Sequence, residues 1–487
     1  MNKKINLYIQ YFLPYFTVFL ATIYRPIDPD LGWHLKYGEY FFKNFRILRE
    51  NIFSTEMPNF IWANISWGAD LVYYLFYSFG GFLGLSIGGA LVVMFTFFFF
   101  AKAYDLDFWE KAIIFPIILF FMNPVSANSF RGQQLSLLLF GVLIYLLSRY
   151  EKLKGKIIYL VPVLFLIWAN THGLFVVGLG VLGLWEIFYL LGLFLESKKM
   201  RLLIPEIKKF SIVTLLSFVA TLIHPYGIRI YEDALLHFND PLLKRVAEYL
   251  PATELSQQWI NLVITIVIAG IGILAYLFTG IWKSKLPQIG LFSVLYILST
   301  WVRRYSWAMY YVVIPFLKPL VNFIRPDSKR GVFYGGSILF IIYITIILLL
   351  KQPYRQFLDM NWDVYCSEIS QCSPQAAKVL NKYYIEGKTM TLYNWGGWLI
   401  WNYPHLKPSS DGRMHLWRDE NGYSAFVHDY ALEQNMKDID KSKYDVVFTA
   451  TYKPIFKRLK KLSADKKWNF VYQDKTTALF KRSKLQM

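Results

Sequence analysis

Long stretches without charged side chains alternate with short basic segments over the first 350 residues of the chain. A helix needs about 20 apolar residues to cross about 30 Å of hydrocarbon, so stretches free of Asp, Glu, Lys and Arg mark candidate spans. One such stretch is interrupted by the polar residues 170–173, and it therefore predicts two spans. The pattern predicts about eleven transmembrane helices: Ile5–Tyr24, Leu71–Ala101, Ala112–Phe130, Gly132–Ser148, two within Ile157–Trp185, Phe210–Ile228, Leu255–Trp282, Leu286–Val302, Tyr305–Leu317 and Gly331–Leu350.

Lys and Arg residues predict the orientation of these helices. With the N-terminus in the cytoplasm, the inner segments carry 19 basic residues and the longer outer loops before the last span carry 11. This difference is the positive-inside bias. An odd number of spans then places the C-terminal part on the extracytoplasmic side. The two longest loops, 25–66 and 224–258, lie on that side, and long loops on one face usually carry function.

The hydropathy pattern changes after residue 352. Four short strand-like runs lie between Lys- and Arg-rich helical segments, at Thr389–Tyr393, Asp445–Ala450, Asn469–Gln473 and Thr477–Lys481. The predicted fold class is therefore a polytopic α-helical membrane domain, 1–352, followed by a small extracytoplasmic α/β domain, 353–487.

Composition agrees with a membrane protein and excludes other classes. Hydrophobic residues make up 55% of the chain, charged residues 17%, and the mean hydropathy is +0.33, whereas soluble proteins contain about 25% charged residues. An aromatic content of 19% excludes disorder. The net charge of +19 is better explained by orientation and anionic headgroups than by nucleic-acid binding. The only cysteines, Cys366 and Cys372, lie on the predicted outer side and favour a disulfide over a zinc site.

The first outer loop opens with two carboxylates and an imidazole within seven residues, Asp28-Pro29-Asp30-Leu31-Gly32-Trp33-His34. Ionisable groups beside hydrocarbon are costly and usually functional. Asp28 or Asp30 suits a general base for an acceptor hydroxyl. Both together suit a hard divalent cation, Mg²⁺ or Mn²⁺. His34 is a candidate substrate-binding residue, and the structural alternative for the whole motif is a polar helix cap.

Further polar residues fall at the predicted outer ends of later helices. The candidate substrate-binding residues among them are Arg131, Gln133, Asn170, His172, His224, Tyr226, Arg303 and Arg304. An arginine can bind phosphate through two parallel hydrogen bonds, although Arg at a helix end also anchors headgroups. Their convergence favours a site at the outer membrane boundary for a charged, lipid-linked group. We expect Asp28 and Asp30 to face Arg131 and His172 there.

Several blocks together resemble bacterial multi-pass proteins of the GT-C glycosyltransferase type. The resemblance covers nearly the whole chain, and its blocks occur in the same order: 28–35, Gly38-Glu39, Ile52-Phe53-Ser54, Trp62, Ser66-Trp67-Gly68, Arg131-Gly132-Gln133, 168–173, His224-Pro225-Tyr226-Gly227, Tyr393-Asn394-Trp395-Gly396-Gly397 and Asp411-Gly412-Arg413.

This resemblance implies an integral-membrane hexosyl- or pentosyltransferase of the cell envelope, in the plasma (inner) membrane. Such enzymes take a sugar from a polyprenyl phosphate or pyrophosphate on the outer leaflet, usually with inversion at the anomeric carbon. An outer-loop Asp acts as base or orients the acceptor, and the match places that role on Asp28 or Asp30. The implied partners are the lipid-linked sugar, the bilayer and a glycan, lipid or protein acceptor. No cofactor is implied with certainty beyond the cation considered above.

Two other functions are compatible with the pattern. A transporter or flippase of lipid-linked saccharides would favour internal repeats and charged groups at mid-membrane, whereas the polar groups here cluster at helix ends. A non-catalytic envelope assembly protein would instead bind its ligand around Trp395 and Asp411. For Asp411-Gly412-Arg413 a structural role is favoured, because Asp-Gly is a common turn and Arg413 can pair with a nearby carboxylate.

Overall fold

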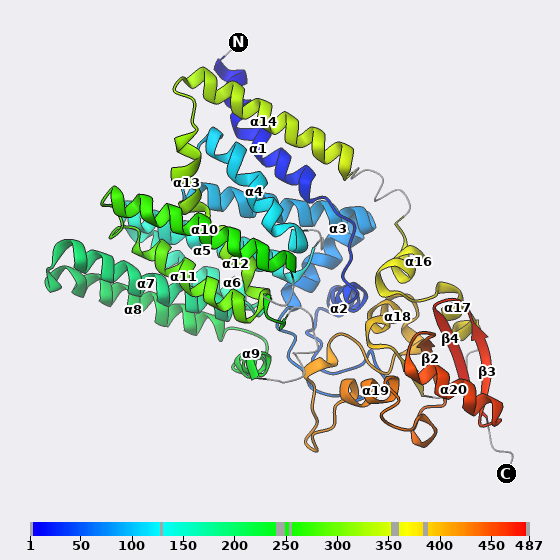
Figure 1. The fold of residues 1–487 in the computed structure, drawn as a ribbon. Coiled ribbons are helices and arrows are strands. Elements are labelled where there is room, and N and C mark those ends of the chain that lie inside the picture. The colour runs from blue at the N-terminus through cyan, green and yellow to red at the C-terminus, as the bar shows by residue number, and fades with distance from the viewer. Residues whose placement is uncertain are drawn as a thin grey trace. The chain divides into compact units, whose positions relative to one another are not determined.

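The computed structural model describes residues 3–126, 130–239, 249–252, 256–351, 360–382 and 388–483. The chain forms two compact units (Figure 1). The first, called the helical unit below, comprises Met1–Tyr24, Ser86–Leu235 and Pro241–Tyr354. The second, called the mixed unit, comprises Arg25–Leu85, Leu236–Asp240 and Arg355–Met487. The mixed unit therefore joins the C-terminal part of the chain to its first predicted outer loop.

The helical unit has helical residues at every span that the sequence predicts. Its helices are α1 (Lys3–Thr22), the second part of α3 (Trp67–Ala103), α4 (Phe108–Ser126), α5 (Gly132–Leu153), α6 (Val161–Ala169), α7 (Phe175–Ser197), α8 (Met200–Thr221), α10 (Ser256–Phe278), α11 (Leu286–Trp301), α12 (Ser306–Val312), α13 (Ile314–Phe323) and α14 (Lys329–Leu350). The predicted span Tyr305–Leu317 corresponds to two short helices, α12 and α13.

Five helices in the described residues are long and apolar enough to cross a membrane: Trp67–Ala103, Gly132–Leu153, Phe175–Ser197, Gln257–Phe278 and Lys329–Leu350. The shorter apolar helices Lys156–Ala169 and Leu286–Trp301 fall below that length. The membrane character of the chain is thus confirmed, and the number of eleven spans stays a prediction.

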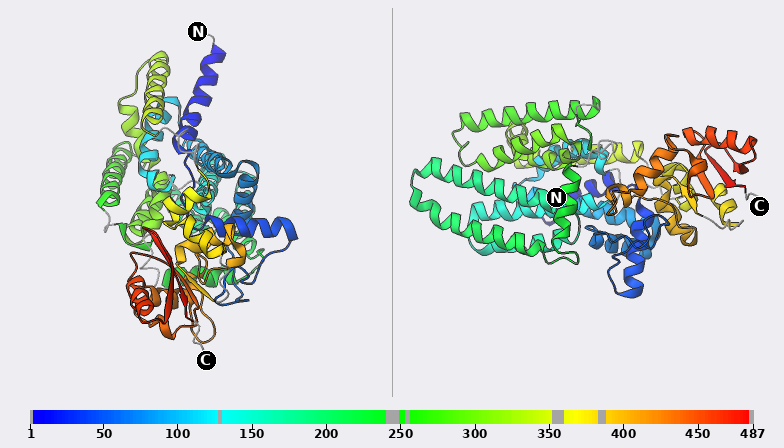
Figure 2. Two further views of the ribbon diagram at one scale, coloured as in Figure 1. Left: turned by 90° about the vertical axis from the view of Figure 1, so that its right-hand side faces the viewer. Right: turned by 90° about the horizontal axis from the view of Figure 1, so that it is seen from below.

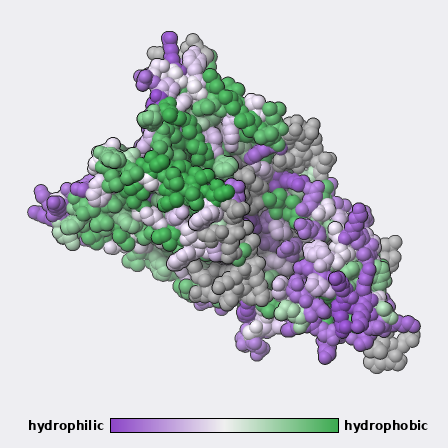
Figure 3. Space-filling model, viewed as in Figure 1, coloured by the Kyte–Doolittle hydropathy of each residue, from purple (hydrophilic) through white to green (hydrophobic). Residues whose placement is uncertain are grey.

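The helices pack through aromatic and small residues and leave apolar surface outside. Figure 2 shows α7 and α8 running side by side. Inside the unit, the rings of Phe100 and Tyr311 stack with centroids 4.3 Å apart. Outward-facing side chains such as Val267 on α10 and Ile341 on α14 are more than half exposed. Figure 3 shows a largely hydrophobic face on this unit, which suits contact with lipid tails.

Helix α3 is broken rather than continuous. Gly80 and Gly81 have non-helical backbone angles, and Gly81 has a φ of 55°, which glycine adopts without the strain that a Cβ would cause. The uncharged run Leu71–Ala101 therefore forms two helical pieces. The first piece belongs to the mixed unit and carries Asp70 in its first turn.

The two predicted outer loops are not loops throughout. Residues Leu31–Asn44 form helix α2, and Arg229–Asn239 form helix α9. A turn at Asp28–Asp30 starts α2, and its apolar residues Leu31, Leu35 and Gly38 recur on one buried side. Of the second loop, 240–248 and 253–255 lie outside the described residues.

The four predicted strands are confirmed and form one sheet in the order β1-β2-β4-β3. Its elements, with the neighbouring helices, are α16 (Trp362–Tyr365), α17 (Pro374–Lys382), β1 (Thr389–Thr391), α18 (Gly396–Asn402), α19 (Ala425–Glu433), β2 (Val446–Ala450), α20 (Pro454–Ala464), β3 (Trp468–Gln473) and β4 (Thr477–Arg482). Every residue of the central strand β2 is buried, as expected for a strand covered on both faces.

The connection from β1 to β2 carries two of the sequence blocks considered above. These strands are parallel, with Thr389 opposite Val446, whereas β2–β4 and β4–β3 are antiparallel. A parallel pair needs a long crossover, because the chain must return to the same end of the sheet. The crossover here contains α18, α19 and the two blocks 393–397 and 411–413.

Candidate functional site

The acidic motif is built around Asp28, which shapes the turn into α2. Its side chain is buried, and Oδ1 accepts a hydrogen bond from the backbone N–H of Asp30 over 3.1 Å. The Tyr365 hydroxyl donates to the backbone carbonyl of Asp28. Cys366, the next residue, forms a disulfide with Cys372, the alternative that the sequence favours over a zinc site. Asp28 thus fixes the backbone on which Asp30 is presented.

Asp30 occupies the N-cap position of α2 but makes no side-chain capping hydrogen bond. An Asp at this position normally accepts from the first amides of the helix. Instead, its carboxylate lies against Gly412, where a Cβ would approach Oδ1 to 1.8 Å. The carboxylate is partly exposed and points to Gly412 rather than to the helix that it precedes.

Glycines bring the crossover close to the start of α2. A Cβ at Gly32 would lie 2.0 Å from the backbone oxygen of Gly397, and one at Gly397 would lie 2.7 Å from that of Pro29. Both neighbours are backbone atoms, so neither can move aside cheaply. The first-loop block and the two crossover blocks of the sequence resemblance therefore form one assembly.

His34 is held one turn after Asp30 by residues from α3 and the preceding loop. Its Nδ1 lies 2.5 Å from Oδ1 of Asp70, and Nδ2 of Asn64 donates to the other oxygen of Asp70 over 2.6 Å. Asp70 is fully buried. Burial alone would lower the pKa of His34, but the charges of Asp70, Asp28 and Asp30 and the hydrogen bond to Asp70 raise this pKa above its ordinary value.

A second pair, Asp411 and Arg413, flanks Gly412 in the crossover. Nε and Nη2 of Arg413 each donate to Asp411 over 2.7 Å, and Nη2 also donates to Ser54 and Asn51. The Ser54 hydroxyl donates to Asp411 as well. Burial would raise the pKa of Asp411, but the Arg413 charge and these hydrogen bonds hold it below the ordinary value.

Aromatic rings enclose the guanidinium of Arg413. Its Cζ lies 5.1 Å from the ring centre of Phe53 and 5.3 Å from those of Trp62 and Trp417. Cation–π contacts of this kind stabilise a desolvated guanidinium. The expectation that Arg413 pairs with a nearby carboxylate holds, and the partner is Asp411.

Polar residues of the helical unit gather at the ends of α5 to α8. Nδ1 of His172 lies 2.9 Å from the Ser136 hydroxyl, which also accepts from Trp168. Asn170 donates to the carbonyl of Ile223, next to His224. Within this unit, the predicted turns around Asn170, His172 and His224 thus lie at corresponding helix ends.

The remaining predicted residues of the helical unit take separate positions. Arg131 precedes α5 as its N-cap residue, and Gln133 is buried in the first turn. Nδ1 of His224 accepts from the backbone N–H of Tyr226 over 3.2 Å. Arg303 and Arg304 form a 3₁₀ turn after α11, where Arg304 donates to the Tyr249 hydroxyl and stacks on its ring. That Asp28 and Asp30 face Arg131 and His172 stays a prediction.

Asp70 and Asn64 are the residues that the sequence reasoning missed. Asp70 directly precedes the uncharged run that begins at Leu71. An acidic side chain at the start of an apolar stretch is itself a signal, because ionisable groups at the edge of hydrocarbon are usually kept for a purpose. Asn64 carried no such signal.

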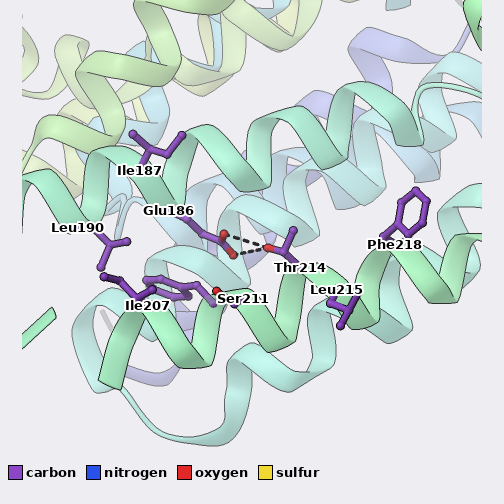
Figure 4. A pocket seen from close by; sticks show the side chains of 9 residues that line it. Glu186, Ile187, Leu190, Ile207, Ser211, Thr214, Leu215 and Phe218 are labelled. Carbon is purple, nitrogen blue, oxygen red and sulfur yellow. Dashed lines mark hydrogen bonds between the residues drawn. The ribbon is translucent and has the colours of Figure 1, made fainter. Parts of the chain in front are cut away.

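A groove along α7 and α8 contains a further carboxyl group. It is lined by Glu186, Ile187, Leu190, Ile207, Phe210, Ser211, Thr214, Leu215 and Phe218. Figure 4 shows the Thr214 hydroxyl turned to the carboxylate of Glu186, which it contacts over 2.8 and 2.9 Å. The hydrogen bonds from Thr214 satisfy the carboxyl group of Glu186, which lies halfway along the apolar helix α7. None of the predicted site residues lies in this groove.

The two loop carboxylates do not by themselves fit a divalent cation. The described residues include no group of three or more His, Cys, Asp or Glu side chains arranged to hold a metal ion. In addition, Asp28 already bonds its own turn, and Nδ1 of His34 is occupied by Asp70. Mg²⁺ or Mn²⁺ prefers about six oxygen ligands, so most would have to come from substrate or water.

Fold and site together define a polytopic helical membrane protein in which residues 25–85 form one mixed unit with the C-terminal part of the chain. Solved structures with this fold belong to GT-C membrane glycosyltransferases, which confirms the resemblance at the level of the fold. No family model matches the sequence, and no curated protein matches it either.

The chain is similar to AglB, the oligosaccharyltransferase of Archaeoglobus fulgidus, in complex with an inhibitory peptide and a dolichol-phosphate. The two structures superpose with a TM-score of 0.57 at 10% sequence identity, and the match covers 99% of this chain and 75% of AglB. It is also similar to ArnT of Cupriavidus metallidurans bound to undecaprenyl phosphate, with a TM-score of 0.55 and 11% sequence identity. This match covers 99% of this chain and 98% of ArnT. A further AglB structure contains Zn and sulfate, with TM-score 0.53, 10% identity, 97% of this chain and 73% of AglB.

Proposed function

We propose that the protein is an integral-membrane glycosyltransferase that transfers a sugar from a polyprenyl phosphate or pyrophosphate to an acceptor. The fold likeness to an oligosaccharyltransferase and to a protein that binds undecaprenyl phosphate supports this function. The observation that carries it is the position of the Asp30 carboxylate, which is partly exposed at the start of α2 and lies against Gly412 of the crossover. A carboxylate that reaches the surface can meet the hydroxyl of an acceptor.

In this proposal Asp30 is the base. Its carboxylate takes the proton of an acceptor hydroxyl while that oxygen forms a bond to the anomeric carbon. The bond from this carbon to the phosphate oxygen breaks, and the lipid phosphate leaves with the electron pair, which inverts the sugar. A positioned base contributes about 10²–10⁴-fold to such a step. Asp28 acts as a positioning residue, because it shapes the turn that presents Asp30.

The helical unit supplies the other proposed contacts. Arg131, His172, Arg303 and Arg304 would stabilise the charge that develops on the leaving phosphate. Gln133, Asn170, His224 and Tyr226 would bind the remaining polar parts of the substrates. A divalent cation would bind to Asp28 and Asp30 only as a bridge to phosphate, and no step proposed here depends on it.

The reaction is proposed for the extracytoplasmic face of the plasma (inner) membrane. The excess of Lys and Arg in the predicted inner segments supports a cytoplasmic N-terminus and an extracytoplasmic mixed unit. The acceptor is then a glycan, lipid or protein of the cell envelope, and the transferred sugar is a hexose or pentose.

The test uses the full-length protein in nanodiscs with radiolabelled polyprenyl-phosphate sugars. Wild type should consume the donor and release lipid phosphate. D30N should lower this rate by about 10²-fold or more, because an amide cannot accept the proton. The matched control is D363N, an exposed aspartate paired with Lys378 in the same unit.

Three outcomes contradict the proposal. Full activity of D30N would remove Asp30 as the base. Movement of labelled lipid between leaflets without consumption would identify a transporter. Binding without movement or consumption would favour an assembly protein.

A further inference from the structure

Asp70 is a buried carboxylate with two partners that hold it in place. It lies in the first turn of α3, and its oxygens contact Nδ1 of His34 over 2.5 Å and Nδ2 of Asn64 over 2.6 Å. Asp70 and Asn64 are almost completely buried. Burying a carboxylate costs free energy unless its partners are well placed, so this arrangement serves the one partner that reaches the surface, His34.

The imidazole of His34 is fixed on three sides. Asp70 holds Nδ1, the Trp33 ring stacks on the imidazole with centroids 3.6 Å apart, and the Tyr73 ring meets it edge-on at 5.4 Å. The side chain is 15% exposed. No hydrogen bond joins Nε2 to any residue that the structure describes. The ring is therefore held in one orientation. Nδ1 contacts the buried Asp70, and Nε2 can contact a ligand.

A carboxylate on one nitrogen decides what the other nitrogen can do. It selects the tautomer and orientation of the ring and stabilises a positive charge on it. Asp28 and Asp30, at the turn that begins α2, add to the negative potential at His34. A cationic imidazole in this position presents an N–H at Nε2, and the strongest partners for such a donor are anionic oxygens.

We propose that Asp70 and Asn64 are positioning residues for His34, and that His34 donates a hydrogen bond from Nε2 to a phosphate oxygen of the lipid-linked donor. This inference rests on the proposed function. The acceptor hydroxyl gives its proton to Asp30, so the departing phosphate is the reactant that gains negative charge and needs a donor. Residue 34 lies one helical turn from Asp30, which places both groups at the same end of α2.

Two substitutions separate the two nitrogens of the ring. The amide nitrogen of Gln reaches the position of Nε2, and the amide of Asn reaches that of Nδ1. H34Q should therefore keep a donor for phosphate but lose the contact to Asp70. We expect it to lose about tenfold, as D70N should, which is the range seen when outer partners of a functional histidine are removed. H34N keeps the contact to Asp70 but has no donor at the Nε2 position, so it should lose more activity than H34Q. D363N should change nothing.

The binding measurement uses undecaprenyl phosphate and protein in nanodiscs. The chain has seven histidines, and loss of one ¹⁵N signal in H34Q assigns that of His34. Undecaprenyl phosphate should shift the Nε2 signal of His34 in wild type and shift it less in D70N. Undecaprenol, which lacks the phosphate, should shift neither. This spectroscopic result does not depend on whether any variant turns over.

The results that overturn the inference differ from those that overturn the proposed function. An Nε2 signal unmoved by undecaprenyl phosphate in a protein that transfers sugar would overturn the role of His34 alone. H34N as active as wild type, or H34Q as impaired as a folded H34N, would do the same. A shifted Nε2 signal in a protein that transfers no sugar would support the phosphate contact and overturn the transferase.

Discussion

Two aspartate pairs in the mixed unit differ in how completely they are closed. Asp411 and Arg413 are both fully buried, and Ser54 and Asn51 take up further hydrogen bonds. Asp70 is equally buried, but its partner His34 reaches the surface. We propose that the closed pair stabilises the fold, whereas the open pair orients a side chain that can reach a ligand. The contrast distinguishes a structural network from the one to which we assign a function.

The largest effect is expected from opening the closed pair. R413M leaves Asp411 buried without its cation, and breaking such a pair costs about 3–5 kcal/mol. Thermal unfolding followed by intrinsic fluorescence should show a destabilised or unfolded mixed unit. The control is K378M, which breaks an exposed pair. Equal stability of R413M and wild type would contradict the structural role of this pair.

A smaller effect is expected from removing the disulfide. The double substitution C366S/C372S opens a short loop, and the chain-entropy estimate for such a loop is about 2 kcal/mol. The neighbouring Tyr365 donates to the carbonyl of Asp28, so activity should also fall by a few fold. Reductant should reproduce both effects in wild type. If reductant changes neither stability nor activity, the bond does not support the acidic turn.

The position of the Asp30 carboxylate can be tested without removing Asp30. G412A places a Cβ 1.8 Å from the present position of Asp30 Oδ1, so the carboxylate must move. We expect about tenfold lower kcat, equivalent to about 1.4 kcal/mol, with unfolding nearly unchanged. G183A is the control, because a Cβ there meets no atom within 4 Å. Wild-type kcat in G412A would mean that the position of Asp30 does not matter.

The smallest effect concerns pH, and the two pairs should respond in opposite directions. The lowered pKa of Asp411 adds stability above about pH 3.9, which is lost as pH falls through the folded-state pKa. The raised pKa of His34 adds stability below about pH 6.5, which is lost as pH rises through the folded-state pKa. The unfolding free energy should be measured against pH in wild type, D411N and H34Q. D411N should lack the decrease at acidic pH that wild type shows, and H34Q should lack the decrease that wild type shows as pH rises through the pKa of His34. If both decreases persist in the variants, both assignments are contradicted.

The sequence predicted those features that depend on local pattern. The four strands follow apolar runs, and β2 occurs where five consecutive residues are buried. Helix α2 was missed because its region was read as a loop, although an Asp directly before an apolar run, here Asp30 before Leu31, is a helix-start signal. The break at Gly80–Gly81 was missed because an uncharged run has the same hydropathy whether it is one helix or two.

The candidate site was predicted only in part, because its completion is non-local. Asp28, Asp30 and His34 are neighbours in sequence, and their chemistry could be recognised there. Their supports come from Asp70 on α3 and from Gly397 and Gly412 on the crossover. The periodicity of a single sequence cannot predict that Gly412 lies against the carboxylate of Asp30, several hundred residues away.

The contact between Ser54 and Asp411 joins positions 357 residues apart. The ribosome must therefore synthesise more than four-fifths of the chain before the segment around Ser54 can meet its permanent partners. Until then this segment lacks the side chain of Arg413 that its aromatic rings enclose. Chains that terminate early would carry the acidic motif without this support, so the motif can take its final form only late in synthesis.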